Sequence, residues 1–150
     1  MPIEFEEKGP SWDDLKQLTE QMDGVEIAAG VLPKAGKEKN GADLVDVAVW
    51  NEYGTKNIPK RPFIRIATRD NEKDWQGMAA KLAEGVINGT DSLQQGLEKI
   101  GNKMEGDIKE VIGDRSRLKA NAPATIRKKG SDAPLKDDAE LQQGISFEIR

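Results

Sequence analysis

The sequence predicts an α+β fold in which a small, mainly antiparallel sheet packs against two long antiparallel helices, with long interaction loops. Two successive segments repeat apolar residues at helical spacing, and the short connection NGTDS joins them, so the two helices should pack antiparallel. Residues 144–150 alternate between apolar and polar side chains, as a half-buried strand does. A chain of 150 residues is long enough for one domain with its own core.

The N-terminal quarter predicts an arm, a helix and a strand. Residues 1–10 are acidic and end in a Gly-Pro pair, which indicates an arm or an edge strand. Ser11 with Asp14 three positions later predicts an approximate capping box. The helix that it opens should run through Gly24, with its apolar residues at Trp12, Leu15, Leu18 and Met22. Residues 25–32 then indicate a strand that Pro33 ends.

The middle of the chain predicts a short helix and a stiff loop. A polar loop over residues 34–40 precedes a helix over about 42–53. Gly54 can adopt the positive φ that a helix C-terminus often requires. Pro59 and Pro62 fix the loop that follows, since proline restricts its own φ and the preceding residue. Read by itself, this segment is a rigid surface turn joining two helices.

The two long helices follow this loop. Phe63, Ile64 and Ile66 should pack inward, and the acidic residues 70–72 mark a helix start. The first long helix ends at residues 88–89 and has apolar residues at Trp75, Met78, Ala79, Leu82, Ala83, Val86 and Ile87. Thr90 or Asp91 should cap the second, whose apolar residues are Leu93, Leu97, Ile100, Met104, Ile108 and Ile112. Its three glycines, Gly96, Gly101 and Gly106, indicate either close approach to another helix or a neighbouring subunit, or local flexibility of this helix.

The segment from about 114 to 138 predicts a long basic loop without helix or strand periodicity. Six basic residues fall between Asp114 and Asp132 with no acidic residue between these two aspartates. A loop of this length in a compact domain is usually functional or disordered. The final strand can pair only with a distant strand, such as 25–32, or with a neighbouring subunit.

The composition argues against most catalytic classes. The chain has no cysteine and no histidine, which removes the thiolate nucleophile and the commonest general base and metal ligand. The acidic group Asp137, Asp138 and Glu140 could bind a cation, but such groups are usually just solvated. No phosphate-loop, nucleophile-elbow or zinc-protease motif is present. We therefore expect a protein that is not an enzyme and takes no cofactor.

Net charge and hydropathy limit the kinds of partner that this chain is expected to have. The net charge of -4 does not suggest a general nucleic-acid binder. No apolar run is long enough to cross a bilayer, and the N-terminus lacks the order of a signal peptide. We expect synthesis in a cytoplasm, no membrane contact, and retention there at least until assembly.

Two sequence segments resemble a known family. Residues 50–55 (WNEYGT) with 58–63 (IPKRPF), and residues 123–130 (PATIRKKG) with 133–135 (APL), are similar to the tail-completion, or neck, proteins of long-tailed bacteriophages. The resemblance covers about residues 44–150. The chain departs from it at 136–141, where KDDAEL replaces the family's aspartate-threonine-glycine-x-leucine run.

The resemblance implies a non-enzymatic structural virion protein of a tailed phage or prophage. Such a protein forms a ring, commonly six- or twelvefold, at the head–tail junction and joins the tail to the capsid connector. Its expected partners are further copies of itself, head-closure or connector proteins and tail-tube proteins, with at most non-specific contact to DNA in a channel. The expected location is the virion, after synthesis in the host bacterial cytoplasm.

The residues expected to contact other subunits lie in the two segments of the resemblance. They are Trp50, Glu52, Tyr53, Thr55, Lys60, Arg61 and Phe63, followed by Arg127 and Lys128. Two alternatives stay open at this point. Trp50 and Phe63 could belong to the core, and Glu52 could form an ion pair with Arg61 that braces the loop.

A different class of function is the alternative to the ring protein. The basic residues of 115–129 could neutralise several phosphates, as in a non-specific DNA-binding accessory protein of phage DNA packaging. No aromatic residue is interleaved with them for base stacking, so sequence reading is not expected. The same loop could instead bind an acidic protein neighbour.

Overall fold

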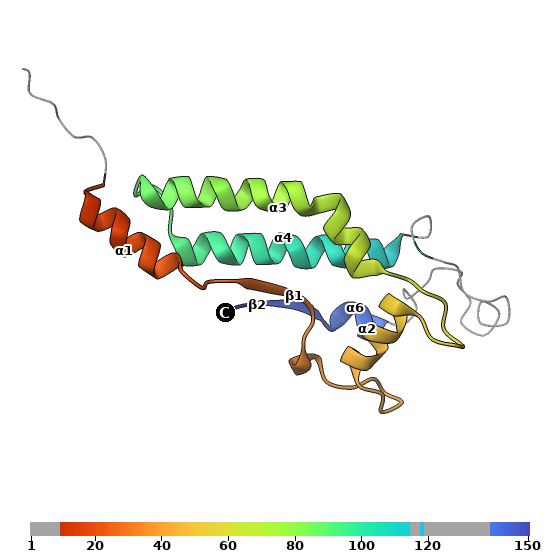
Figure 1. Cartoon of the computed structure of the whole chain (residues 1–150). Helices are drawn as coiled ribbons and strands as arrows, with labels where there is room; N and C mark the ends of the chain where they lie inside the picture. The colour runs from red at the N-terminus through yellow and green to blue at the C-terminus, as the bar shows by residue number, and fades with distance from the viewer. Residues whose placement is uncertain (1–9, 115–117, 119–138) are drawn as a thin grey trace, which may run out of the picture.

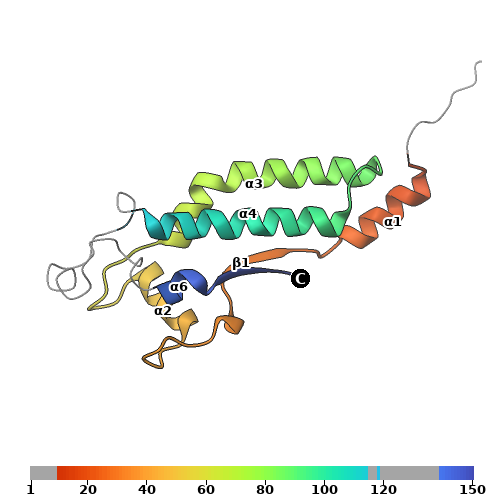
Figure 2. The same cartoon turned by 180° about the vertical axis from the view of Figure 1, so that it is seen from behind.

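The computed structural model describes residues 10–114, 118 and 139–150. Helix α3 lies on helix α4, and α4 lies on a two-stranded sheet, so the elements form three layers (Figure 1). Seen from behind, α2 and α6 lie together at one end of the sheet, and α1 extends beyond the other end (Figure 2). The elements are α1 (Trp12–Met22), β1 (Ile27–Val31), the 3₁₀ turn η1 (Pro33–Ala35), α2 (Leu44–Tyr53), α3 (Phe63–Ile87), α4 (Leu93–Gly113), α6 (Ala139–Gln143) and β2 (Ile145–Ile149). The predicted α+β architecture is confirmed.

The sheet joins the two ends of the described chain. Strands β1 and β2 pair antiparallel, from Ile27 opposite Ile149 to Val31 opposite Ile145. The apolar residues of β2 alternate along the strand and therefore share one face. On that face the Phe147 ring packs against Gly101 of α4, which shows that α4 covers the apolar side of the sheet. Of the two alternatives for the last strand, the structure shows pairing with the strand within residues 25–32.

Buried apolar side chains form two clusters of unequal size. The larger cluster lies where α2, α4, α6 and the start of α3 meet, and Phe63, Val111, Ile112 and Leu141 within it are fully buried. The smaller cluster, at the other end of the long helices, has only three buried members, which are Leu82, Val86 and Ile100. Most apolar residues around that smaller cluster are only partly buried.

A capping box closes the N-terminus of helix α1. Ser11 Oγ accepts a hydrogen bond from the Asp14 amide, and the Asp14 carboxylate accepts one from the Ser11 amide, so the predicted capping box is confirmed. The hydrogen bonds from Ser11 lower the pKa of the Asp14 carboxyl below its ordinary value. No residue of α1 is buried, and Trp12 is 83% exposed.

Three sequence expectations need correction. Helix α3 begins at Phe63 rather than at residues 70–72, and Ser92 rather than Thr90 or Asp91 caps α4. Glu140 lies in the short helix α6 and not in a solvated loop. The N-terminal arm, Asp137 and Asp138, and almost all of the basic loop lie outside the described residues. Within the described part, no helix combines the length and hydropathy needed to cross a bilayer.

The glycines of α4 differ in their surroundings. A Cβ on Gly96 would lie 2.0 Å from Leu82 of α3, and one on Gly101 would lie 2.2 Å from the Phe147 ring. A Cβ on Gly106 would meet no atom within 4 Å. Close approach to a neighbouring element therefore explains the first two glycines and does not explain the third.

This difference gives a prediction with opposite signs at two glycines of one helix. Gly101→Ala should destabilise the protein by about 1–3 kcal/mol, because the Phe147 ring must shift. Gly106→Ala should stabilise it by up to about 1 kcal/mol, because alanine favours the helix and meets no obstacle. Chemical denaturation of both variants measures the two changes. Equal effects would show that α4 does not approach β2 this closely.

Candidate functional site

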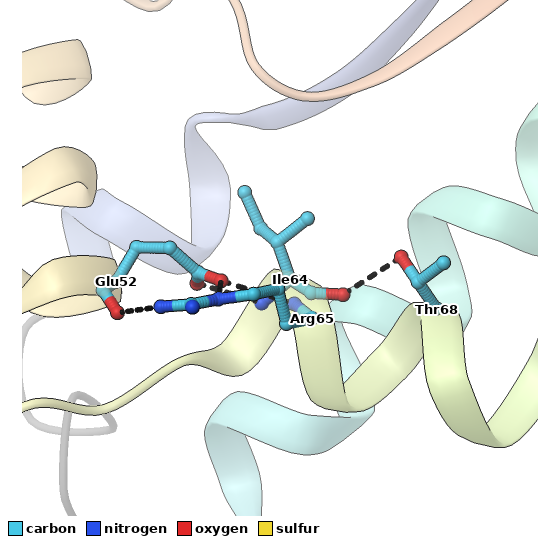
Figure 3. A network of polar contacts seen from close by, with 4 residues as sticks. All are labelled: Glu52, Ile64, Arg65 and Thr68. Carbon is cyan, nitrogen blue, oxygen red and sulfur yellow. Dashed lines mark hydrogen bonds and ion pairs between the residues drawn. The ribbon is translucent and has the colours of Figure 1, made fainter.

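The carboxylate of Glu52, near the end of α2, caps the N-terminus of α3. Glu52 Oε2 accepts the amide of Ile64 at 3.0 Å, and Oε1 accepts the amide of Arg65 at 3.1 Å (Figure 3). These amides belong to the first turn of α3, where no partner within the helix exists. A negative charge at this end of a helix is also favoured by the helix dipole. One side chain therefore fixes the start of a helix eleven positions later in the sequence.

Arg65 completes this contact from the other side. Its Nε donates to Glu52 Oε1 at 2.9 Å, and its Nη2 donates to the Glu52 carbonyl at 2.6 Å. That carbonyl is in the last turn of α2, where acceptors lack partners within the helix. The guanidinium also lies 4.9 Å from the centre of the Tyr53 ring. Arg65 thus connects the first turn of α3 to the last turn of α2.

A second set of bonds joins Asn51 to Arg61. The Arg61 amide donates to the Asn51 carbonyl at 2.6 Å, and Arg61 Nη1 lies 3.4 Å from Asn51 Oδ1. Asn51 Nδ2 in turn donates to the Val47 carbonyl. Arg61 is only 8% exposed, and burial lowers the pKa of its guanidinium from the ordinary value. A guanidinium remains protonated in proteins, so this charge stays on the inner side of the loop.

The loop between these two sets is folded on itself. Gly54 has a φ of +77°, and a Cβ there would lie 3.1 Å from the Lys60 amide nitrogen. The Thr55 amide donates to the Ile58 carbonyl, and Thr55 Oγ1 accepts the Ile58 amide at 3.0 Å. The loop therefore has a fixed shape, as its prolines predict. We call Asn51, Glu52, Gly54, Arg61 and Arg65 the α2–α3 clasp.

Helix α3 bends shortly after the clasp (Figure 1). Thr68 Oγ1 donates to the Ile64 carbonyl at 2.9 Å, and Asn71 Nδ2 donates to the Ala67 carbonyl at 2.9 Å. Side chains that bond to the carbonyl four residues earlier often bend a helix. The bend lets the first turns of α3 reach α2 while the rest of the helix follows α4.

The clasp leaves one face of α2 apolar and exposed. Val49, Trp50 and Tyr53 are 47%, 41% and 67% exposed. Tyr53 lies three positions after Trp50 and four positions after Val49, so it shares a helix face with each of them. The opposite face, with Leu44, Val47 and Ala48, is buried in the core. A helix that is apolar on both sides is ordinarily buried on both. We call Val49, Trp50 and Tyr53 the α2 patch.

The predicted contact residues separate into three groups. Trp50, Tyr53, Thr55 and Lys60 are exposed and can meet another molecule. Glu52, Arg61 and Phe63 are buried within the chain and hold the loop or the core. Arg127 and Lys128 lie outside the described residues.

The proposed brace between Glu52 and Arg61 is corrected by the structure. The partner of Glu52 is Arg65, because the first turn of α3 starts at Phe63 and places Arg65 next to the carboxylate. The residues predicted from the sequence include neither Arg65, which binds Glu52, nor Val49, which belongs to the exposed α2 patch. Arg65 lies two positions after the last residue of the IPKRPF run, where a cation can reach the end of the preceding helix.

One further polar cluster links the long helices. Trp75 Nε1 donates to Asp107 Oδ2 at 2.7 Å, and Lys103 Nζ lies 2.5 Å from Asp107 Oδ1. Asp107 is 7% exposed, and both of its oxygens are satisfied. This cluster fixes the distance between α3 and α4. Within the described residues, no three carboxylates lie together as a group that could hold a metal ion.

The clasp predicts that removal of the buried Glu52 carboxylate lowers the stability of the protein strongly. Glu52→Ala should destabilise the protein by about 2–4 kcal/mol, because it removes a helix cap and leaves the Ile64 and Arg65 amides and the Arg65 guanidinium without this acceptor. Chemical denaturation measures this change. Glu52→Gln, which keeps one acceptor oxygen but loses the charge, should give a smaller loss.

Glu110→Ala is the matched control, because Glu110 is an exposed glutamate on α4. Its substitution should change the free energy of unfolding by no more than about 0.5 kcal/mol. If Glu52→Ala were as mild as this control, the Glu52 carboxylate would not be the cap of α3.

Comparison with protein-family models, with curated proteins and with solved structures found no match to this chain. Residues 50–55 and 58–63 form the end of α2, the loop and the start of α3, so they contain much of the clasp and of the α2 patch.

Proposed function

We propose that this protein is a non-enzymatic structural component of a tailed phage or prophage particle. In this proposal its copies form a ring at the head–tail junction, at the neck or the tail terminus, and join the tail to the capsid connector. The resemblance of residues 50–63 and 123–135 to neck proteins supports this role. The protein would be made in the host cytoplasm and end in the virion.

The α2 patch is the observation that carries the proposal. Three large apolar side chains lie on one exposed helix face, beside a loop that internal hydrogen bonds hold in one shape. Aromatic residues on a preorganised surface are typical of protein interfaces, because little conformational entropy is lost when they bind. The patch therefore supports a protein partner better than a small substrate.

Polar residues border the α2 patch, and the neighbour that we propose for it in a ring is another copy of the chain. Thr55 and Lys60 are exposed next to it and provide polar groups, as the rim of an interface usually does. In a closed ring, one surface of each copy meets a different surface on the next copy. The head-closure or connector proteins on one side and the tail-tube proteins on the other are the remaining expected partners.

The double substitution Trp50→Ala and Tyr53→Ala tests this function. It should weaken binding to the neighbouring subunit by at least about 2 kcal/mol, or about 30-fold in Kd, because interface aromatics often carry most of the binding energy. Particles made with this variant should separate into heads and free tails in electron micrographs. The variant loses the contact of Tyr53 with Arg65 and the covered part of Trp50, so its binding is compared at a temperature where chemical denaturation shows it to be folded.

Trp12→Ala is the control, since Trp12 is also an exposed tryptophan but lies on α1. Particles with this variant should keep their tails. Intact tailed particles without the protein would contradict the proposal. A steeply salt-dependent affinity for DNA, together with intact particles, would instead favour the packaging accessory protein.

A further inference from the structure

The outer edge of β1 is open in the described part of the chain. Glu26 and Arg150 exchange both amide-to-carbonyl hydrogen bonds, so the pairs that follow alternate between bonded and unbonded. The amides and carbonyls of Ile27, Ala29 and Val31 therefore point away from β2. Among the described residues, no partner to these groups is found.

The two edges of the sheet are not equivalent. From η1, Lys34 Nζ donates to the Phe147 carbonyl on the outer edge of β2 at 3.3 Å, and a lysine that covers a strand edge hinders the addition of another strand. Among the described residues, no side chain is hydrogen-bonded to the outward amides and carbonyls of Ile27, Ala29 and Val31 on the β1 edge. A further strand would therefore add to β1 rather than to β2.

An apolar groove of about 330 Å³ lies next to the start of β1. One wall is formed by Met22, Val25 and Ile27, and the rest comes from the facing sides of α3 and α4, with Ala79, Leu82 and Leu97 among its residues. It lies over the smaller core cluster, whose surrounding apolar residues are only partly buried. A strand added to β1 could place apolar side chains into this groove.

The chain contains a segment that fits this description. Residues 3–6 read Ile-Glu-Phe-Glu, with two large apolar residues alternating with two acidic ones. This alternation gives a strand one apolar face and one charged face. Paired with β1, such a strand would place Ile3 and Phe5 in the groove and Glu4 and Glu6 toward solvent.

Residues 3–6 cannot pair along β1 of their own chain, because the stretch of chain that joins them to α1 is too short. At about 3.6 Å per residue, Phe5 lies within about 18 Å of Pro10. Helix α1 takes up almost all of this length, since its eleven residues span about 16 Å at 1.5 Å per residue. Strand β1 continues beyond the far end of α1 instead of folding back along it (Figures 1 and 2). The segment can reach the middle of β1 only in another copy.

From these observations we infer that residues 2–7 of one copy add as a strand to the β1 edge of a second copy, with Ile3 and Phe5 in the groove. Main-chain hydrogen bonds would supply part of the affinity, as in other cases of strand addition. An arm that meets a different surface on the next copy gives a head-to-tail contact, which can close into a ring. The inference rests on one part of the proposed function, the association of copies, and not on where the assembly acts.

Substitutions in the arm test the association. Phe5→Asp should weaken self-association at least about tenfold in sedimentation equilibrium, because it places a charge in the apolar groove. Glu6→Gln, on the opposite face of the arm, should leave the association within about twofold. The free energy of unfolding of both variants should match that of the unmodified chain at concentrations where it is monomeric. Unchanged association of Phe5→Asp, or a chain that stays monomeric at every concentration, would overturn the inference.

Cross-linking then decides between one chain and two. The chain has no cysteine, so Phe5→Cys and Ala79→Cys introduce the only two thiols of a double variant. A short bis-maleimide should link separate chains, seen as dimers and higher species on a denaturing gel. A link within one chain, or no link, would overturn the inference. In the control pair, Phe5→Cys with Asp46→Cys, no link between chains is expected, since Asp46 is exposed on α2 away from the groove.

The same cross-link separates this inference from the proposed function. The Trp50→Ala and Tyr53→Ala variant should still give the link between residues 5 and 79, because the α2 patch does not line the groove. If the arm variants associate normally while the α2 variant loses its tails, the inference is wrong and the proposed function stands. If the arm link forms but particles keep their tails without the protein, the proposed function is wrong and the inference stands.

Discussion

The Glu52 carboxylate at the N-terminus of α3 is the contact on which the arrangement of the rest depends. A helix of this length needs acceptors for its first amides, and the sequence before Phe63 consists of prolines and basic residues that provide no side-chain cap. Glu52 supplies the acceptors from α2, and Arg65 returns the interaction to the end of α2. As a result, the loop between the two helices closes in one conformation, and α2 is held against the larger core cluster with its second face outward.

This arrangement separates folding from binding within one short motif. The buried members, Asn51, Glu52 and Arg61, hold the loop, while the exposed members, Trp50 and Tyr53, add little to the core. Tyr53 also stacks with the Arg65 guanidinium, which limits its motion before any partner binds. The motif therefore has a structural reason for its buried residues, and its exposed aromatic residues are left for a role outside the folded chain. That is the physical basis of the proposed docking function.

Sequence reasoning succeeded where a signal repeats along the chain. The stripe from Leu93 to Ile112 and the alternation from Ile145 to Ile149 each depend on a period, and both elements are found where they were expected. The start of α3 was wrong because a local search for acidic residues finds 70–72 and cannot see a cap from Glu52. The burial of Arg61 and the pairing of Glu52 with Arg65 depend on how two helices meet, which no periodicity records. The contact roles of Arg127 and Lys128 stay predictions.

Amide hydrogen exchange at Ile64 and Arg65 tests the central claim, the cap from Glu52, most directly. First-turn amides of a helix usually exchange quickly, because they have no partner within the helix. With the carboxylate in place, we predict exchange at least about a hundredfold slower than at the Trp12 and Asp13 amides of α1, which the Ser11 cap does not bind, measured by nuclear magnetic resonance at neutral pH. Exchange at Ile64 and Arg65 as fast as in α1 would contradict the account.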